Sequence, residues 1–127
     1  MAINRVLYNI MTSDLAATRD FYVRLLDMVP IYDSAWYIVL KPAEESPHEL
    51  GVIDVSHEVV PEAFHGSPAG TYLTFVVDDV TEVFRRAQDL GFEILEPPTV
   101  LFYGQRRMLV ADPNGLLVDI SSPTSGE

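Results

Sequence analysis

The stretch VLYNIMTSDLAATRDFYVRLLDM, residues 6–28, predicts a β-strand that leads directly into an amphipathic helix. Its first part, Val6–Met11, is rich in β-branched, aromatic and aliphatic residues. The side-chain oxygens of residues 12–14 then suit a helix N-cap. From Leu15 onward, apolar residues recur at intervals of three and four, and Pro30 is expected to stop the helix.

Three further strands are expected after this helix. They cover Ile31–Tyr32, Trp36–Leu40 and Leu50–Val55, and the polar, proline-containing segment Pro42–Glu49 forms a loop between the last two. The first part of the chain is therefore predicted to be one βαβββ unit.

The same order begins again at YLTFVVDDVTEVFRRAQDLGF, residues 72–92, where Gly91 ends the second helix. Strands are expected at Phe92–Leu95, Gln105–Val110 and Leu116–Ile120. The two copies align through their capping aspartates with an offset of 65 (79 − 14), and the last strands give the same value (119 − 54). The second half of the sequence therefore repeats the first.

The repeat predicts an α+β fold in a single domain of 127 residues, with module one at about 1–58, a connector at 59–70 and module two at about 71–123. In a βαβββ unit, the helix covers one face of the sheet. Two such units are expected to join their sheets into a cupped, mixed sheet with the helices outside. The concave face is the expected ligand site.

Composition excludes several kinds of function. The chain has no cysteine, which rules out disulfides, thiolate ligands and a thiol nucleophile. Nineteen acidic and eight basic residues give a formal charge of −11, which disfavours nucleic-acid binding. The sequence has neither an apolar run of about 20 residues nor a signal segment. We expect a cytoplasmic protein with no membrane partner.

Both stretches quoted above resemble the opening of modules in the vicinal oxygen chelate superfamily, which includes glyoxalase I, bleomycin-resistance proteins and extradiol dioxygenases. The closing stretch YGQRRMLVADPNGLLVDI, residues 103–120, is similar to the family's final strands. The resemblance covers nearly the whole chain. It also implies a homodimer, since short two-module chains of this kind often pair.

The resemblance implies metal-ligand positions that this chain fills unusually. The family's usual histidine positions fall at Leu7 and Tyr72, and its carboxylate positions fall at Asp54 and Asp119. We therefore expect no cofactor. A divalent metal such as Mg²⁺, held by the two aspartates and water, stays open as an alternative. The histidines at positions 48, 57 and 65 are interpreted as ordinary surface residues.

Strand alternation places Leu7 and Asn9 on one face of their strand and Tyr72 and Thr74 on the equivalent face of theirs, where Asn9 and Thr74 would orient a ligand. Adjacent Arg106 and Arg107 must point to opposite faces, so one of them, taken to be Arg107, reaches the ligand. Two aromatic pairs at corresponding places would stack on a planar or cationic ligand, or would serve in core or dimer packing: Trp36, Tyr37, Phe102 and Tyr103.

These observations leave three functions open. The first is a binding protein of the bleomycin-resistance type that holds a small aromatic or cationic molecule without the usual metal. The second is a metal-dependent lyase or dioxygenase that uses Asp54 and Asp119. The third is a metal-free isomerase or lyase in which the same two aspartates are the catalytic acid and base.

Overall fold

The computed structural model describes residues 1–124, and the chain divides into two compact units. The first unit spans Met1–Pro68 and the second begins at Ala69, so the division falls inside the predicted connector. Each unit is described by itself.

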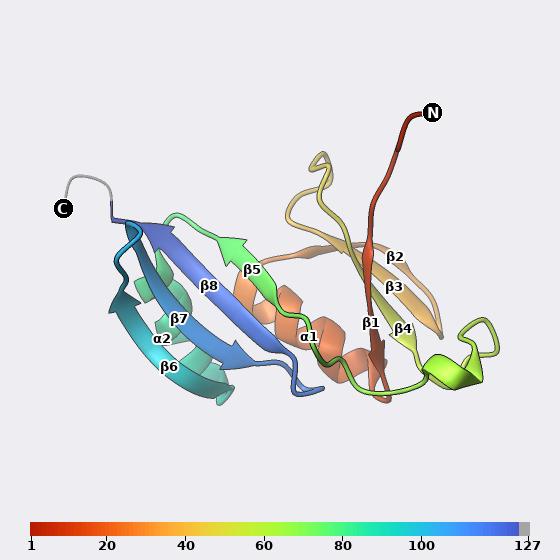
Figure 1. The fold of residues 1–127 in the computed structure, drawn as a ribbon. Coiled ribbons are helices and arrows are strands. Elements are labelled where there is room, and N and C mark those ends of the chain that lie inside the picture. The colour runs from red at the N-terminus through yellow and green to blue at the C-terminus, as the bar shows by residue number, and fades with distance from the viewer. Residues whose placement is uncertain (125–127) are drawn as a thin grey trace. The chain divides into compact units, whose positions relative to one another are not determined.

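The first unit contains one mixed sheet and one long helix (Figure 1). Its sheet has the strand order β1-β4-β3-β2, in which β1 and β4 are parallel and the other neighbours are antiparallel. A short 3₁₀ helix, Glu62–Phe64, follows the sheet. The elements are β1 (Tyr8–Thr12), α1 (Leu15–Leu26), β2 (Val29–Asp33), β3 (Tyr37–Lys41) and β4 (Leu50–Asp54).

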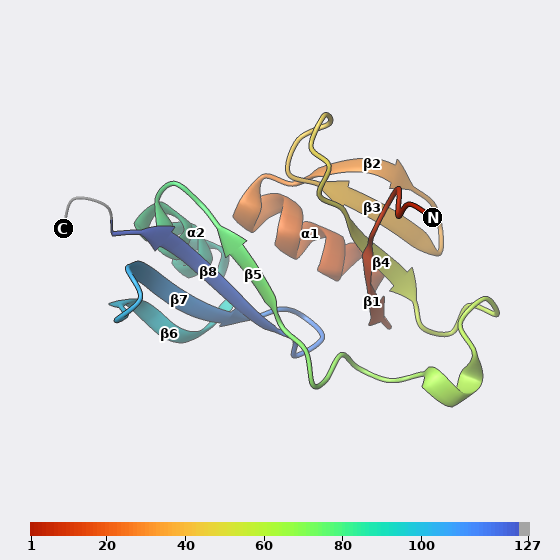
Figure 2. The same ribbon diagram turned by 45° about the horizontal axis from the view of Figure 1, so that its top comes forward.

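The second unit repeats this plan with the strand order β5-β8-β7-β6 and a parallel β5–β8 pair (Figure 2). Its elements are β5 (Leu73–Val76), α2 (Val80–Leu90), β6 (Glu93–Val100), β7 (Gln105–Ala111) and β8 (Leu117–Pro123). The α+β class and the repeated βαβββ order predicted from the sequence are confirmed. Neither α1 nor α2, the long helices of the described residues, has the length and apolarity needed to cross a bilayer.

Both long helices begin where the sequence predicts. Asp14 Oδ1 accepts from the Ala17 amide at 3.0 Å, and Asp79 Oδ1 accepts from the Thr81 amide at 3.0 Å. The predicted end of the first helix at Pro30 is wrong. α1 ends at Leu26 because Asp27 adopts a left-handed conformation (φ 56°), and Pro30 lies in β2.

The first sheet packs one face against α1. Ile10, Ile38, Leu40 and Val52 on this face are almost completely buried, each contributing about 1.5–3 kcal/mol of hydrophobic stabilisation. Helix α1 contributes the buried residues Thr18, Phe21, Tyr22 and Leu25. The alternating residues form the other side, which we call the distal face of the first sheet: Asn9, Met11, Tyr37, Val39, Gly51 and Ile53.

The second sheet is built in the same way. Met108, Val110, Val118 and Ile120 are fully buried on the side of α2, which contributes Val80, Val83 and Ala87 to the core. The Val80 amide donates to Ser122 Oγ at 3.3 Å on this side. The distal face of the second sheet comprises Thr74, Val76, Glu96, Gln105, Arg107, Leu109, Asp119 and Ser121.

The two sheets pair their parallel strands in different registers. Asn9 lies beside Gly51 in the first sheet, whereas Thr74 lies beside Asp119 in the second. A constant offset of 65 would have paired Asn9 with Asp54, so β4 is displaced by three residues (54 − 51). Because side chains alternate between faces, this odd displacement turns Asp54 to the α1 side. The predicted equivalence of Asp54 and Asp119 does not hold in the strand pairing.

Candidate ligand-binding faces

Asp119 is a buried carboxylate on the distal face of the second sheet. Asp119 lies on β8 and is 7% exposed. Thr74 Oγ1 donates to its Oδ2 at 3.3 Å, while Oδ1 is buried without a hydrogen-bond partner among the described residues. Burial raises the pKa of Asp119, and the charge of Arg107 and the bond from Thr74 only partly oppose this shift.

Arg107 lies on the same face of the neighbouring strand. Its Nη2 donates to Glu96 Oε1 at 3.3 Å, and its Nε is buried without a partner among the described residues. Burial alone would lower the pKa of Arg107, but Glu96, Tyr103 and Asp119 together raise it. Arg106 pairs with Ser122 on the α2 side, so the prediction that the two arginines point to opposite faces is confirmed.

Gln105 is a site residue that the sequence analysis missed. It stands two residues before Arg107 on β7 and therefore shares the distal face. Its Oε1 is a third buried polar atom without a partner among the described residues. The signal was present in the sequence, because the alternation that selects Arg107 also selects Gln105.

Exposed aromatic and aliphatic side chains accompany these polar groups. Tyr72, 59% exposed, precedes β5 in alternation with Thr74, and Val76 is 65% exposed. Tyr103 lies close enough to Arg107 to affect its pKa, as given above. Phe102 is 99% exposed at the β6–β7 hairpin and packs edge-on against Tyr103, with ring centres 5.2 Å apart. Phe102 therefore lies at a hairpin tip, off the sheet face.

The distal face of the first sheet carries a neutral polar pair. The Tyr37 hydroxyl donates to Asn9 Oδ1 at 2.8 Å. Burial raises the pKa of Tyr37, and nearby Arg5 opposes this while Glu49 adds to it. A Cβ on Gly51 would lie 2.0 Å from Asn9 Oδ1, so the pair exists only because residue 51 has no side chain.

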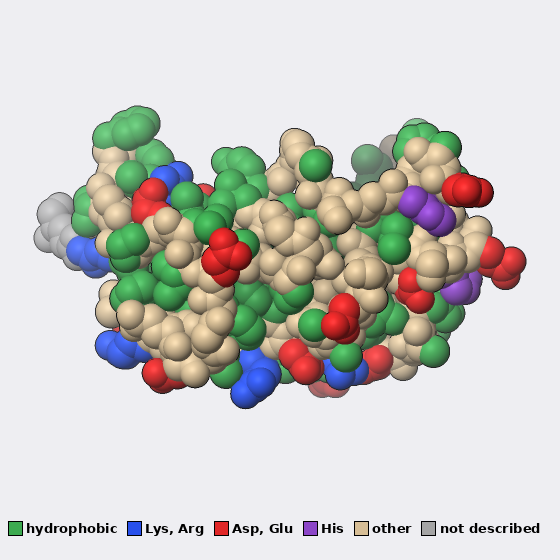
Figure 3. Space-filling model, turned by 90° about the horizontal axis from the view of Figure 1, so that it is seen from below, with side chains coloured by type: hydrophobic (Ala, Val, Ile, Leu, Met, Phe, Trp, Pro, Cys, Tyr) green, Lys and Arg blue, Asp and Glu red, His purple; other side chains and the backbone are tan. Residues whose placement is uncertain are grey.

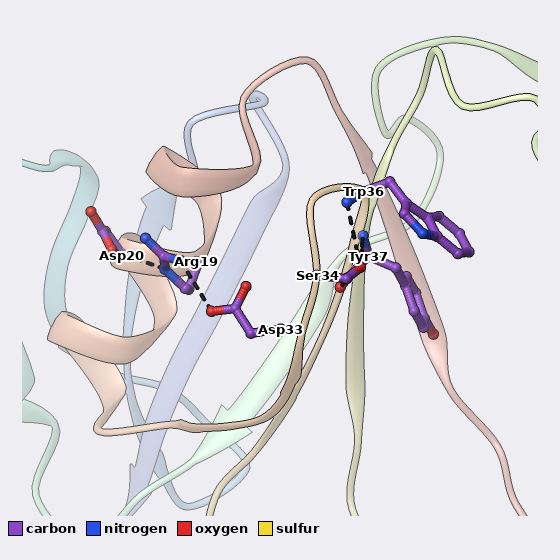
Figure 4. Close-up of polar contacts among 6 residues, drawn as sticks. All are labelled: Arg19, Asp20, Asp33, Ser34, Trp36 and Tyr37. Carbon is purple, nitrogen blue, oxygen red and sulfur yellow. Dashed lines mark hydrogen bonds and ion pairs between the residues drawn. The ribbon is translucent and has the colours of Figure 1, made fainter.

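Trp36 and Tyr37 lie together where β3 begins. Their amides donate to Ser34 Oγ, and their rings stack with centres 5.6 Å apart. Figure 4 shows both rings on the side of β3 away from Arg19 of α1, which bonds Asp33 and Asp20. Trp36 also stacks on His57 at 4.0 Å. The predicted surface histidine His57 is therefore engaged with the aromatic pair.

The first unit also has an open pocket of about 510 Å³ beside its amino-terminal segment. Leu7 lies just before β1 in this region and is partly buried. Arg5 and Glu49, which both line this pocket, form two hydrogen bonds of 2.6 and 2.5 Å. The two charged groups of the pocket lining therefore already satisfy each other.

The two predicted carboxylates, Asp54 and Asp119, have different surroundings. Asp54 Oδ1 accepts from the Ser56 amide and hydroxyl at 2.9 and 2.7 Å, and these bonds lower the pKa of Asp54. Its side chain closes the turn after β4. No group of three histidine, aspartate or glutamate side chains gathers among residues 1–124. With Leu7 and Tyr72 at the histidine positions, the donor set does not fit a histidine-and-carboxylate metal centre.

The remaining charges are dispersed. Figure 3 shows acidic side chains scattered among apolar ones on this face of the molecule, with no single acidic patch. His65 Nε2 lies 2.9 Å from the Val60 carbonyl oxygen. Asp119 differs from exposed acidic side chains of this kind because it is buried, with 7% of the residue exposed.

Comparison with known proteins decides the family. The family model described as Glyoxalase/Bleomycin resistance protein/Dioxygenase superfamily matches residues 2–120. The chain belongs to this superfamily. The resemblance read from the two repeated stretches is confirmed. A search of curated proteins gives no match.

Several solved structures share this fold, and two of the three described below are of superfamily proteins. A family enzyme from Burkholderia phytofirmans PsJN is similar, with TM-score 0.78 and 20% identity over 92% of this chain and 96% of that one. A superfamily member from Sphaerobacter thermophilus DSM 20745 has a TM-score of 0.74 and 20% identity, over 95% of this chain and 98% of that one. TioX from Micromonospora sp. ML1 has a TM-score of 0.74 and 18% identity, over 98% of this chain and 99% of that one. At these identities, the likeness shows the fold alone.

Proposed function

We propose that this chain binds a small aromatic or cationic organic molecule on the distal face of its second sheet, without the usual metal of the superfamily. Asp119 and Arg107 orient the polar end of the molecule, and Thr74 holds the Asp119 carboxylate in place. Asn9, Leu7, Trp36 and Tyr37 remain the corresponding ligand-contact candidates of the first unit.

The observation that carries this proposal is the unpaired Oδ1 of Asp119. Buried polar atoms in proteins almost always have a hydrogen-bond partner, because leaving one unpaired costs about 1–3 kcal/mol. Asp119 is 7% exposed and its Oδ1 has no partner among the described residues. A ligand that donates a hydrogen bond to this oxygen would remove that cost.

The surroundings of Asp119 favour an aromatic ligand. Val76 on β5, the strand next to β8, and Tyr72, which precedes β5, are more than half exposed, and Tyr103 lies near Arg107. Binding sites for small molecules combine apolar walls with a few directed polar groups. Rings that stack on tyrosine would gain this contact, and a cationic group would also gain from the Asp119 charge.

A second candidate is metal-free acid–base catalysis, and it is favoured by the raised pKa of Asp119. A carboxyl group that holds its proton at higher pH is better suited to donate or accept a proton during a reaction. Bound molecules that are converted to new products by the protein, but not by Asp119→Asn, would support this isomerase or lyase candidate over simple binding.

The test is ligand-observed NMR with small aromatic probes: benzyl alcohol, benzylamine and benzamide. We expect saturation transfer to at least one probe, and loss of that transfer in Asp119→Asn. The matched control is Asp89→Asn, which removes an equal charge from exposed α2 of the same unit. Transfer that persists in Asp119→Asn, or that is absent for all three probes, would overturn the proposal.

The homodimer stays a prediction, which light scattering of the purified protein checks.

A further inference from the structure

Asp119 and Arg107 present two complementary unpaired atoms. Oδ2 of Asp119 is bonded to Thr74, so its buried Oδ1 is left as an acceptor. Nη2 of Arg107 is bonded to Glu96, so its buried Nε–H is left as a donor. Arginine stays protonated throughout the working pH range, so this donor is permanent.

These two atoms belong to neighbouring positions of one face. Arg107 is opposite Ser121 and Asp119 is opposite Leu109 on the β7–β8 ladder, which makes them diagonal neighbours. Side chains at diagonal positions are about 7–8 Å apart at the backbone and meet when one of them is long. Each charge also acts on the other: burial raises the pKa of Asp119, and Arg107 opposes that rise.

We propose that this pair recognises a neutral group with an N–H donor beside a carbonyl acceptor, as in a primary carboxamide or a lactam edge. The inference rests on the proposed function and narrows its ligand class. The N–H of the group donates to Asp119 Oδ1, and its carbonyl oxygen accepts from Arg107 Nε–H.

Charge explains why the group is neutral. A carboxylate would satisfy Arg107 but would place its charge against Asp119, and an amidinium would satisfy Asp119 but would leave the Arg107 Nε–H without an acceptor. Glu96 already pairs with Arg107, so a cation gains from the Asp119 charge but still leaves this donor unpaired. A group with one donor and one acceptor satisfies both buried protein atoms and leaves neither unpaired.

The experiment uses three planar probes of nearly equal size: benzamide, benzoate and benzamidine. Benzamide has donors and an acceptor, benzoate has acceptors only, and benzamidinium has donors only. Dissociation constants are measured by NMR titration at neutral pH and moderate salt. We expect benzamide to bind about tenfold more tightly than either charged probe, since each charged probe leaves one buried atom unpaired or opposed.

Two variants should change the preference in opposite directions. Asp119→Asn removes the negative charge and should move the preference toward benzoate, whereas Arg107→Gln removes the positive charge and should move it toward benzamidine. Arg106→Gln is the control, because it removes the same charge from the adjacent residue on the α2 side. Thermal unfolding of every variant verifies that it is folded.

The outcomes separate this inference from the proposed function. Tighter binding of benzoate or benzamidine than of benzamide to the unaltered protein would overturn the inference and leave small-molecule binding intact. An equal response of the preference to Arg106→Gln and Arg107→Gln would also overturn it. Failure of these probes and of benzyl alcohol and benzylamine alike would overturn both.

Discussion

The Tyr37 hydroxyl and Asn9 Oδ1 meet at 2.8 Å directly over Gly51, on the distal face of the first sheet. Arg107 occupies the corresponding place in the second sheet. Tyr37 pairs with Ile53, two residues after Gly51, which is the strand partner of Asn9. Arg107 pairs with Ser121, two residues after Asp119, which is the strand partner of Thr74. One sheet therefore holds a neutral pair that is satisfied internally. The other holds charged groups with unpaired atoms, which makes it the better candidate for a ligand.

Gly51→Ala should disrupt the Tyr37–Asn9 pair. The added methyl would lie 2.0 Å from Asn9 Oδ1 and 2.8 Å from the Tyr37 oxygen, so both side chains must move. Because both atoms are the ends of side chains on an exposed face and can move aside, the cost is that of the lost hydrogen bond, about 0.5–1.5 kcal/mol. We expect a loss of that size in the free energy of unfolding, measured by urea denaturation.

Gly66→Ala is the matched control, because a Cβ there would meet nothing within 4 Å. It should leave the free energy of unfolding nearly unchanged. Combining Gly51→Ala with Asn9→Ala should restore part of the loss, since the nearest clashing atom is then absent. An equal cost of Gly51→Ala in both backgrounds would contradict the proposed clash.

Asp119→Asn should stabilise the protein while it impairs binding. The pKa of Asp119 is raised in the folded state by burial, so its contribution to stability is present at low pH and is lost as pH rises through the folded pKa. The unfolding temperature of the variant should therefore equal that of the parent near pH 3 and exceed it near pH 7. Replacing a functional group that is held in unfavourable surroundings often stabilises a protein in this way. Calorimetry at the two pH values checks this, with Asp89→Asn, an exposed change on α2 of the same unit, as the control.

The sequence predicts the fold better than it predicts the site, and the reason lies in strand register. Apolar periodicity and the capping aspartates Asp14 and Asp79 are local signals, and both helices begin where these signals indicate. The pairing of β4 with β1 is a long-range property. Because β4 is displaced by three residues, Asp54 and Asp119 lie on different faces of their sheets, and no local pattern in the sequence reveals this displacement.

The ends of elements show the same limit. Alternation correctly separates Arg107 from Arg106, because it depends only on neighbouring residues within one strand. The sequence predicts Phe102 and Tyr103 as a pair of ligand-contact residues, yet Phe102 is 99% exposed at the hairpin. Unpaired atoms such as Gln105 Oε1 depend on the exact placement of three side chains, which a single sequence does not specify.

Arg5→Gln should weaken the protein at neutral pH more than in acid. The hydrogen bond from Arg5 lowers the pKa of Glu49, so its contribution to stability is present above the unfolded pKa and is lost as pH falls through the folded one. The difference from the parent should be largest near pH 7, shrink toward about pH 2, and fall with added salt because Arg5 is more than half exposed. Urea denaturation at each pH measures it. Arg24→Gln, an exposed change on α1, should show a smaller and flatter difference; an identical profile would remove the Arg5–Glu49 pair as the cause.

Removal of divalent metal should leave ligand binding unchanged. Asp54 is engaged by Ser56, and the positions where the superfamily usually has histidine are Leu7 and Tyr72, so Asp119 lacks partner ligands for a tightly held ion. We expect no stoichiometric metal by elemental analysis of tag-free protein, and the same benzamide affinity before and after chelator treatment. The double variant Asp54→Asn, Asp119→Asn is the decisive comparison. Stoichiometric metal in the parent that disappears in this variant would support the metal-dependent lyase or dioxygenase instead, because the ion would then depend on these carboxylates.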